Sequence, residues 1–301
     1  MELTILGCGS AIPTTLRAPT AQIIRIDQEN ILIDCGEGTQ TQIKKFGVKL
    51  QQISTILISH LHGDHYFGLP GLIGTMQLLG RVAPLTIYGP APLEKIIRLG
   101  LDVSYTRLKF DLNFVVTNPK KGEQLVTHKK YTIASFPLKH KIDTTGFVIR
   151  ETPKLPNMKG DLVKFFNIPH YAINGIKAGD DFVTEDGEVI KHEVLTKPAP
   201  KPKSYAFCSD TKYYESVIKH IKGVDVLYHE ATFLNALIKR AVATMHCTAE
   251  QAAIIAKQAE VGTLIIGHYS ARYTAVDEFK IEASAVFNNT ILAEDGLVHK
   301  I

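Results

Sequence analysis

The segment that most constrains the fold of this chain is ISTILISHLHGDHYFGLPG, residues 53–71. An apolar run typical of a buried β-strand ends there, and three histidines and an aspartate follow within six residues. Burying imidazole and carboxylate groups costs free energy unless each finds a partner. Groups this close together cannot all find separate protein partners, whereas a cation with nitrogen and oxygen ligands satisfies them together. These groups are His60, His62, Asp64 and His65.

The spacing of these four residues predicts two metal positions. Strand side chains alternate between faces, so His60 and His62 can point one way while Asp64 and His65 turn toward a second cation. Imidazole nitrogen and carboxylate oxygen suit zinc and tolerate manganese. Two cations can share a hydroxide and stabilise the attacking and leaving oxygens of a hydrolysis. A closed structural zinc site is the alternative, but such sites are usually rich in cysteine and this loop has none.

Short apolar runs alternate with helical patterns along the rest of the chain. Sheets covered by helices are the architecture that this α/β alternation predicts. The alternation continues through the C-terminal third, residues 204–270. In the N-terminal part we expect strands at 20–26, 30–36, 53–60 and 84–89, and helices at 39–47 and 68–80.

Residues 151–203 interrupt this alternation. The segment is rich in Pro, Gly and Lys, its acidic and basic residues nearly balance, and it returns through TKPAPKPKS, a semi-rigid linker. We interpret residues 1–301 as a single domain that carries 151–203 as an inserted arm. A solvated excursion without function is the alternative, but excursions of this length are usually functional or disordered. The Gly and Pro content is typical of a segment that orders on binding.

Composition limits the partners and the compartment. The net charge of +4 and the pI near 8.7 permit a polyanionic partner without requiring one. No apolar run reaches the length of a membrane span, and the N-terminus lacks the basic region of a signal peptide. We therefore expect a cytoplasmic protein with no membrane partner. The four cysteines show no CxxC spacing and are interpreted as reduced, buried thiols. Cys208 and Cys247 lie beside candidate site residues, and a role as metal ligands is the alternative for them.

Several motifs together resemble a known family. HxHxDH after a strand, preceded by LIDCGEG at 32–38, resembles the metallo-β-lactamase superfamily. GCGSAIPTTLRAP at 7–19, YHEATF at 228–233 and MHCTAEQAA at 245–253 are similar to the ribonuclease Z family. The similarity covers nearly the whole chain. It implies a four-layer αβ/βα sandwich of metallo-β-lactamase type, in which outer helices cover two mixed sheets and a dinuclear site lies at one sheet edge.

The resemblance also implies the remaining ligands. His140 in FPLKH, Asp210 in FCSDT and His268 in IIGHYS each follow an expected strand, as a site at a sheet edge requires. The family pattern assigns two Zn²⁺ ions per subunit, with Mn²⁺ as the alternative metal. One ion is expected at His60, His62 and His140, the other at Asp64, His65 and His268, with Asp210 contacting both. Asp34 in LIDCGEG is expected beside the site.

The activity implied by the resemblance is zinc-dependent cleavage of the 3′ trailer from precursor tRNA by a metal-bridging hydroxide. The products are a 3′-hydroxyl on the tRNA and a 5′-phosphate on the trailer. Asp64 both binds metal and orients the hydroxide or accepts its proton. His246 in HCT protonates the leaving 3′-oxygen, and Glu230 in HEAT holds His246 protonated. His229 is expected to make a structural hydrogen bond.

The chain departs from the family in two segments. The first loop, residues 13–18, keeps the Pro and Arg of the PxKxRN pattern but replaces its Lys and Asn. The arm tip IPHYAINGIKAGD lacks the family's Gly-Pro pair, although Lys164 and Lys177 remain available to phosphates. The resemblance implies that the arm grips the tRNA elbow. It also implies a homodimer, in which the metals of one subunit cooperate with the arm of the other.

Two other classes of function stay open from the sequence. One is a small-molecule phosphodiesterase, or another ester or thioester hydrolase of the same superfamily. The other is an RNA-binding scaffold with an inactive site, although every expected ligand is present. The connection between His140 and Asp210 is usually much shorter in small-molecule hydrolases, so the long arm favours a large substrate.

Overall fold

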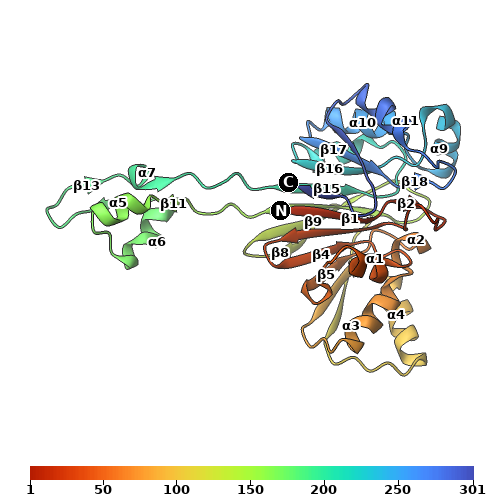
Figure 1. The fold of residues 1–301 in the computed structure, drawn as a ribbon, viewed down its shortest axis with the longest axis horizontal. Coiled ribbons are helices and arrows are strands. Elements are labelled where there is room, and N and C mark those ends of the chain that lie inside the picture. The colour runs from red at the N-terminus through yellow and green to blue at the C-terminus, as the bar shows by residue number, and fades with distance from the viewer. The chain divides into compact units, whose positions relative to one another are not determined.

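The computed structural model describes residues 1–301, and the chain divides into two compact units (Figure 1). The first, called the body below, comprises residues 1–150 and 203–301. The second, called the arm, comprises residues 151–202, one residue shorter than the segment marked by composition. None of the helices combines the length and the apolar character needed to cross a membrane.

The first sheet of the body is built mainly from the N-terminal half of the chain. It is antiparallel from β20 to β4 and parallel from β4 to β7. In spatial order its strands are β20 (Val298–Lys300), β1 (Glu2–Gly7), β3 (Ala21–Ile26), β4 (Glu29–Ile33), β5 (Ile53–Leu57), β6 (Leu85–Gly89) and β7 (Leu112–Val116).

The second sheet contains four parallel strands, β15, β16, β17 and β19, whose carboxyl ends therefore lie at one edge. A short parallel pair, β2 (Gly9–Ser10) and β18 (Tyr269–Ser270), joins the first loop to the chain after β17. In spatial order the strands of the second sheet are β19 (Thr290–Leu292), β17 (Thr263–Gly267), β16 (Val226–Glu230), β15 (Ser204–Cys208), β10 (Thr145–Glu151), β9 (Tyr131–Pro137) and β8 (Glu123–Thr127).

Alternation along the strands separates two apolar cores. On β4, Ile31 and Ile33 belong to the core that includes the second sheet, whereas Leu32 belongs to the core beneath the helices of the first sheet. Those helices are α1 (Thr39–Lys45), α3 (Leu69–Leu78) and α4 (Pro92–Val103), while α10 (Ala249–Gln258) and α11 (Asp277–Ser284) cover the second sheet (Figure 1). The four-layer αβ/βα sandwich implied by the resemblance is confirmed.

The remaining helical segments of the body are short. They are η1 (Leu50–Gln52), α2 (Gly63–Tyr66), η2 (Glu215–Val217), α8 (Ile218–Ile221), η3 (Asn235–Leu237) and α9 (Ile238–Thr244). The predicted strands at 20–26, 30–36, 53–60 and 84–89 and helices at 39–47 and 68–80 correspond to β3, β4, β5, β6, α1 and α3. Asp64 and His65 lie on α2 and not on an irregular loop as the sequence suggested, because a four-residue helix leaves too little periodicity to detect.

The arm has more regular structure than its composition suggested. Apolar side chains from separate short elements meet in a small core of Ile168, Ile176, Ile190 and Leu195. The elements around this core are β11 (Asn157–Met158), α5 (Gly160–Phe165), α6 (His170–Ala178), β12 (Phe182–Val183), β13 (Val189–Ile190), α7 (His192–Leu195) and β14 (Thr196–Lys197). β11 pairs with β14, and β12 pairs with β13 in a hairpin.

Candidate metal centre

The expected ligands of the body follow the carboxyl ends of strands from both sheets. His60 follows β5, His140 follows β9, Asp210 follows β15 and His268 directly follows β17. The backbone N–H of Thr145 donates to the carbonyl of Ser59 at 3.0 Å and joins the two sheets at this point. Residues far apart in sequence therefore meet at one edge of the sandwich, where open α/β sheets commonly place their sites.

Two glycines let the loop after β4 approach α2 closely. A Cβ atom on Gly36 would lie 2.5 Å from the carbonyl oxygen of Asp64, and one on Gly68 would overlap the backbone at Gly36. The Cys35 N–H donates to the carbonyl of His65 at 2.7 Å and locks this packing. Only glycine fits at such contacts, which explains the LIDCGEG and HGDHYFGLPG patterns together.

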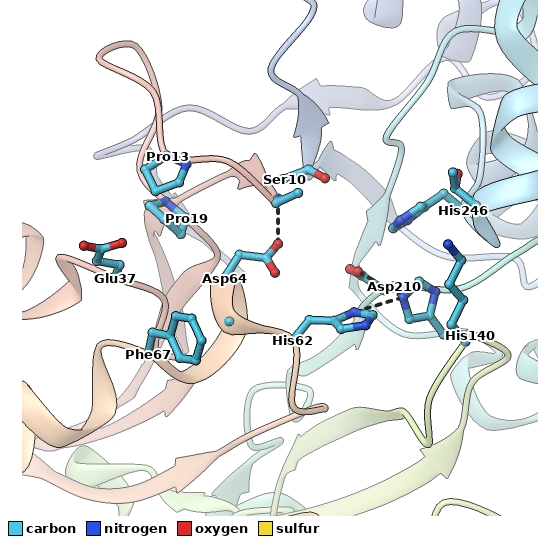
Figure 2. Close-up of a pocket in the computed structure, with 14 residues that line it drawn as sticks. Ser10, Pro13, Pro19, Glu37, His62, Asp64, Phe67, His140, Asp210 and His246 are labelled. Carbon is cyan, nitrogen blue, oxygen red and sulfur yellow. Dashed lines mark hydrogen bonds and ion pairs between the residues drawn. The ribbon is translucent and has the colours of Figure 1, made fainter. Parts of the chain in front are cut away.

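The first set of ligand atoms gathers around one oxygen of Asp210. His62 Nδ1 lies 3.1 Å from His60 Nε2 and 3.2 Å from His140 Nε2. Asp210 Oδ2 lies 3.6 Å from both His60 Nε2 and His140 Nε2. Figure 2 shows His62, His140 and Asp210 converging at one end of the pocket.

The second set gathers around the other oxygen of the same aspartate. Asp210 Oδ1 lies 3.1 Å from His268 Nε2 and 3.4 Å from His65 Nε2. Asp64 Oδ2 lies 3.4 Å from each of those two nitrogens. The two oxygens of Asp210 thus face two groups of three side chains, and these groups have the same members as the two ligand sets that the family resemblance implies.

The geometry of both sets fits divalent cations. Four ligands about 2.1 Å from one ion at tetrahedral corners lie about 3.4 Å apart, close to the separations within each set. His65 Nε2 and Asp210 Oδ1 are buried and have no hydrogen-bond partner, an arrangement that is costly unless a cation fills the space between them. The donors are imidazole nitrogen and carboxylate oxygen, the ligands of zinc and manganese sites.

Hydrogen bonds from the opposite ring nitrogens fix the orientation of the histidines. His65 Nδ1 donates to Asp34 Oδ2 at 2.7 Å, and His140 Nδ1 donates to the Met245 carbonyl at 3.0 Å. In each ring the proton on Nδ1 leaves Nε2 free as a lone-pair donor, as in many metal sites. Asp34 is completely buried beside the site, where the sequence placed it.

Two hydroxyls that sequence reasoning missed anchor the other histidines. Ser59 Oγ donates to Asp34 Oδ2 at 2.8 Å and accepts from His60 Nδ1 at 3.0 Å. Thr232 Oγ1 donates to Glu230 Oε2 at 2.8 Å and accepts from His268 Nδ1 at 2.9 Å. One histidine of each set therefore reaches a buried carboxylate through a hydroxyl. Thr232 lies in the HEAT motif and Ser59 directly precedes His60. Their position next to motif residues was the only sign in the sequence that they contact the site.

Burial and charge set the protonation of the ligands. Burial lowers the pKa of His60 to about 3, and burial also lowers the pKa of His62 and of His140. Burial opposes the charge on Asp64, but the neighbouring His65 and His268 hold the pKa of Asp64 well below its usual range. Three neutral imidazoles and an ionised carboxylate are the forms that bind metal.

His246 lies beside the ligand sets and pairs with Glu230. His246 Nδ1 donates to Glu230 Oε1 at 2.8 Å, and the ring centroid of His246 lies 4.9 Å from that of His140. Burial opposes the imidazolium, but the Glu230 carboxylate outweighs it and raises the pKa of His246 to about 9. At neutral pH the imidazole therefore carries a proton that it can donate.

The fold holds Glu230 at the last position of β16 with every oxygen satisfied. Besides His246 and the Thr232 hydroxyl, three backbone N–H groups donate to it at 2.9–3.1 Å, those of Thr211, Thr232 and Cys247. A left-handed Met245, with φ 60°, ends α9 and turns the chain so that His246 faces the site. Thr248 then begins α10 with a capping box.

The other residues weighed from the sequence lie outside the two sets. His229 is buried and donates from Nδ1 to the Glu230 carbonyl at 2.7 Å, the structural hydrogen bond that was expected. All four cysteines are free and buried, and none belongs to a cluster that can hold a metal. Arg17 of the first loop binds the Tyr273 carbonyl and lies over the Tyr269 ring, so it anchors that loop to the body.

The ligand sets open into a pocket of about 520 Å³. His62, Asp64, His140, Asp210 and His246 all line it, so the candidate ligands and the imidazolium face one solvent-accessible space (Figure 2). The arrangement can hold two cations and, beside them, present one protonated imidazole. It can therefore hydrolyse a bond whose leaving oxygen needs a proton.

Comparison with known proteins identifies the family. Residues 1–156 match the family model described as anti-Pycsar protein Apyc1. A relative named ribonuclease Z from Parabacteroides distasonis is 45% identical over 296 residues, covering 98% of this chain and 97% of that protein. The chain belongs to the ribonuclease Z family. The family model ends before Asp210, His246 and His268, whereas the ribonuclease Z relative spans them.

Solved structures of the same fold match this chain over its whole length. The crystal structure of human tRNase Z, short form, matches with a TM-score of 0.73 and 26% identity, covering 100% of this chain and 99% of that one. The metallo-β-lactamase fold protein YhfI from Bacillus subtilis matches with a TM-score of 0.70 at 20% identity, covering 99% of each chain, and shares the fold.

Proposed function

We propose that this member of the ribonuclease Z family is a zinc-dependent endoribonuclease that cleaves the 3′ trailer from precursor tRNA. The products are a 3′-hydroxyl on the tRNA and a 5′-phosphate on the trailer. The observation that carries this proposal is the placement of Asp210 between two sets of ligand atoms, beside the His246–Glu230 pair. The full-length similarity to relatives named ribonuclease Z supports the substrate.

The proposed metal ligands are the seven side chains of the two sets. One zinc ion would be held by His60, His62 and His140. The second would be held by Asp64, His65 and His268, and Asp210 would contact both ions. When bound, such ions supply a lowered pKa for water and positive charge against the non-bridging phosphate oxygens. Manganese is the alternative metal for the same donors.

Asp64 and His246 have complementary roles in the proposed cleavage. Asp64 accepts the Ala11 N–H at 2.7 Å, which fixes its carboxylate where it can orient the attacking water and take a proton. His246 donates its proton to the 3′-oxygen that leaves from the tRNA. Glu230 keeps His246 protonated through the ion pair at 2.8 Å. The proposed acid, His246, and the proposed base, Asp64, therefore lie at separate places in one pocket.

We propose that the arm is an exosite for tRNA. It interrupts the chain between His140 and Asp210, and its own small core makes it a compact unit. Lys164 and Lys177 can contact phosphates, and recognition of a folded RNA by shape needs few base contacts. The same long insertion disfavours a small molecule as the natural substrate.

We propose that the protein is a homodimer. Leu78, Leu79 and Val82 at and beyond the end of α3, and Leu99 and Val103 on α4, are 60–88% exposed. A second copy of the chain would cover this apolar surface, whose exposure is otherwise unfavourable. Sedimentation of the wild type should give the mass of two chains, and Leu78→Glu with Leu99→Glu should give one. A monomeric wild type would contradict the dimer.

The cleavage proposal is tested with end-labelled precursor tRNA. Wild-type protein with zinc should release the trailer, and a chelator should abolish the cleavage. Mapping the product ends should give a 3′-hydroxyl on the tRNA and a 5′-phosphate on the trailer. Hydrolysis of a small chromogenic phosphodiester without cleavage of the precursor would instead favour the small-molecule alternative.

A further inference from the structure

The pocket at the metal centre has an apolar wall that the cleavage chemistry does not use. Phe67, Pro13 and Pro19 line this wall. Figure 2 shows them on the opposite side of Asp64 from His140 and His246. Phe67 is 60% exposed although it is a large aromatic residue beside a buried polar cluster. Such exposure is unfavourable unless a ligand covers the ring.

The Phe67 ring is held in place before any ligand binds. A Cβ atom on Gly63 would overlap the ring, so the ring rests against the backbone at the start of α2. The Phe67 N–H donates to the Gly63 carbonyl at 2.9 Å, and the Tyr66 ring meets Phe67 edge-on at 4.9 Å. An aromatic surface fixed in this way suits stacking, because little freedom is lost when a planar ligand binds.

Charge distinguishes the two ends of the pocket. In Figure 2 Glu37 lies on the side of the apolar wall and His246 at the opposite end, and Lys141, which follows His140 in the sequence, also lines the pocket. A phosphate beside Glu37 would be repelled, but the N–H and amino groups of a nucleobase can donate to its carboxylate. The apolar wall therefore fits a neutral base, and the opposite end fits the sugar–phosphate backbone.

The direction of cleavage decides which nucleotide lies at which end. In-line attack places the leaving oxygen opposite the attacking one. If His246 protonates the leaving 3′-oxygen, the last nucleotide of the tRNA lies at the His246 end. The first nucleotide of the trailer is joined to the scissile phosphate through its 5′-oxygen and continues away from the tRNA, so the part of the pocket left for its base is the Phe67 end.

We infer that Phe67 stacks on the base of the first trailer nucleotide, with the edge of that base toward Glu37. This inference rests on the proposed function. It assigns the wall of Phe67, Pro13 and Pro19 as a base-binding subsite that positions the scissile phosphate at the metal centre.

The test combines two enzymes with two precursor tRNAs. The precursors are identical except that the second is abasic at the first trailer nucleotide. For the wild type, kcat/KM should fall about ten-fold on the abasic precursor, since stacking of one base on an aromatic ring has about that effect. Phe67→Ala should lose about as much on the normal precursor and nothing further on the abasic one.

Two further variants make the result specific. Phe67→Tyr keeps an aromatic ring and should keep the penalty for the abasic precursor. Tyr105→Ala removes an aromatic side chain that is 83% exposed and does not line the pocket, and it should also keep the penalty. Metal content and thermal unfolding report whether each variant folds.

Three results would overturn the inference. The first is a wild-type enzyme that cleaves both precursors equally. The second is a Phe67→Ala enzyme that still loses activity on the abasic precursor. A wild type that cleaves neither precursor would instead refute the proposed function, and the subsite would be rejected with it.

Discussion

Asp34→Asn tests whether a buried carboxylate controls the metal centre through the tautomer of His65. Asp34 Oδ1 accepts the Ser59 N–H, and Asp34 Oδ2 accepts the Ser59 hydroxyl and His65 Nδ1, all at 2.7–2.8 Å. Asparagine keeps the shape but turns one oxygen into an amide that donates. With that amide toward His65, the imidazole must accept on Nδ1 and carry its proton on Nε2, the atom that faces Asp64 and Asp210.

The size of the effect follows from these contacts. A proton on His65 Nε2 removes one ligand from the second set, and loss of such a supporting hydrogen bond typically costs about 10–100-fold in metal affinity. Two donors that formerly shared Asp34 Oδ2 also lose their acceptor in a completely buried place. We therefore expect the free energy of unfolding of the metal-free protein to fall by about 1–3 kcal/mol.

The assay is competition with a chromophoric chelator for zinc, together with urea unfolding of the metal-free protein. Asp225→Asn is the matched control, because Asp225 Oδ2 accepts both the N–H and the hydroxyl of Ser204, at 2.8 and 2.6 Å, away from any histidine of the site. The control should lose stability and keep its zinc affinity. An Asp34→Asn protein that binds zinc as tightly as the control would refute the tautomer argument.

Three other predictions concern the acid and the arm. Glu230→Gln removes the charge that raises the pKa of His246 to about 9. Because the acid is lost as pH rises through its pKa, the alkaline limb of the kcat/KM profile should move from about pH 9 to about pH 6.5 or below. An unshifted limb would exclude a role for Glu230 in keeping His246 protonated. His246→Ala should slow cleavage of precursor tRNA about 100-fold or more while its RNA affinity changes far less, and an equal loss in a filter-binding assay would remove His246 from the acid role. Replacing residues 151–202 by a short Gly-Ser linker should abolish precursor processing and spare hydrolysis of a small phosphodiester, whereas survival of both activities would refute the exosite.

The fold could be predicted from the sequence because the patterns that indicate its strands and helices are local and recur along the chain. Strand-length apolar runs predicted β3, β4, β5 and β6, and Gly47, at φ 67°, lies just beyond the end of α1, where the sequence predicted that the helix stops. The arm was described less well. Its helices α5 and α6 are short, and the side chains that bury Ile176 come from several turns, so no single stretch carries a strong periodic pattern.

In the candidate site, the ligands that are close together in sequence could be predicted directly, whereas the isolated ones could not. The spacing from His60 to His65 predicts a metal site by itself, since a cation can satisfy four nitrogen and oxygen donors that lie within six residues. His140, Asp210 and His268 are single residues at strand ends, and only the family resemblance selected them. Their roles as ligands stay predictions, although the structure brings their side chains to the same edge of the sandwich.

Residues that act through tertiary contacts carried no signal beyond their adjacency to a motif. The hydroxyls of Ser59 and Thr232 connect histidines to carboxylates that are 25 residues away in one case and two in the other. The exposure of Phe67 depends on the packing of α2 against the rest of the body and cannot be read from an apolar residue in an apolar stretch. Such features depend on the packed structure and not on composition or period.

Anomalous scattering at the zinc edge, from crystals grown with excess zinc, tests the central claim most directly. We predict two peaks on either side of Asp210, the first about 2.0–2.2 Å from His60, His62 and His140 and the second at the same distance from Asp64, His65 and His268. An absence of peaks there, or a single peak that does not contact Asp210, would contradict the account.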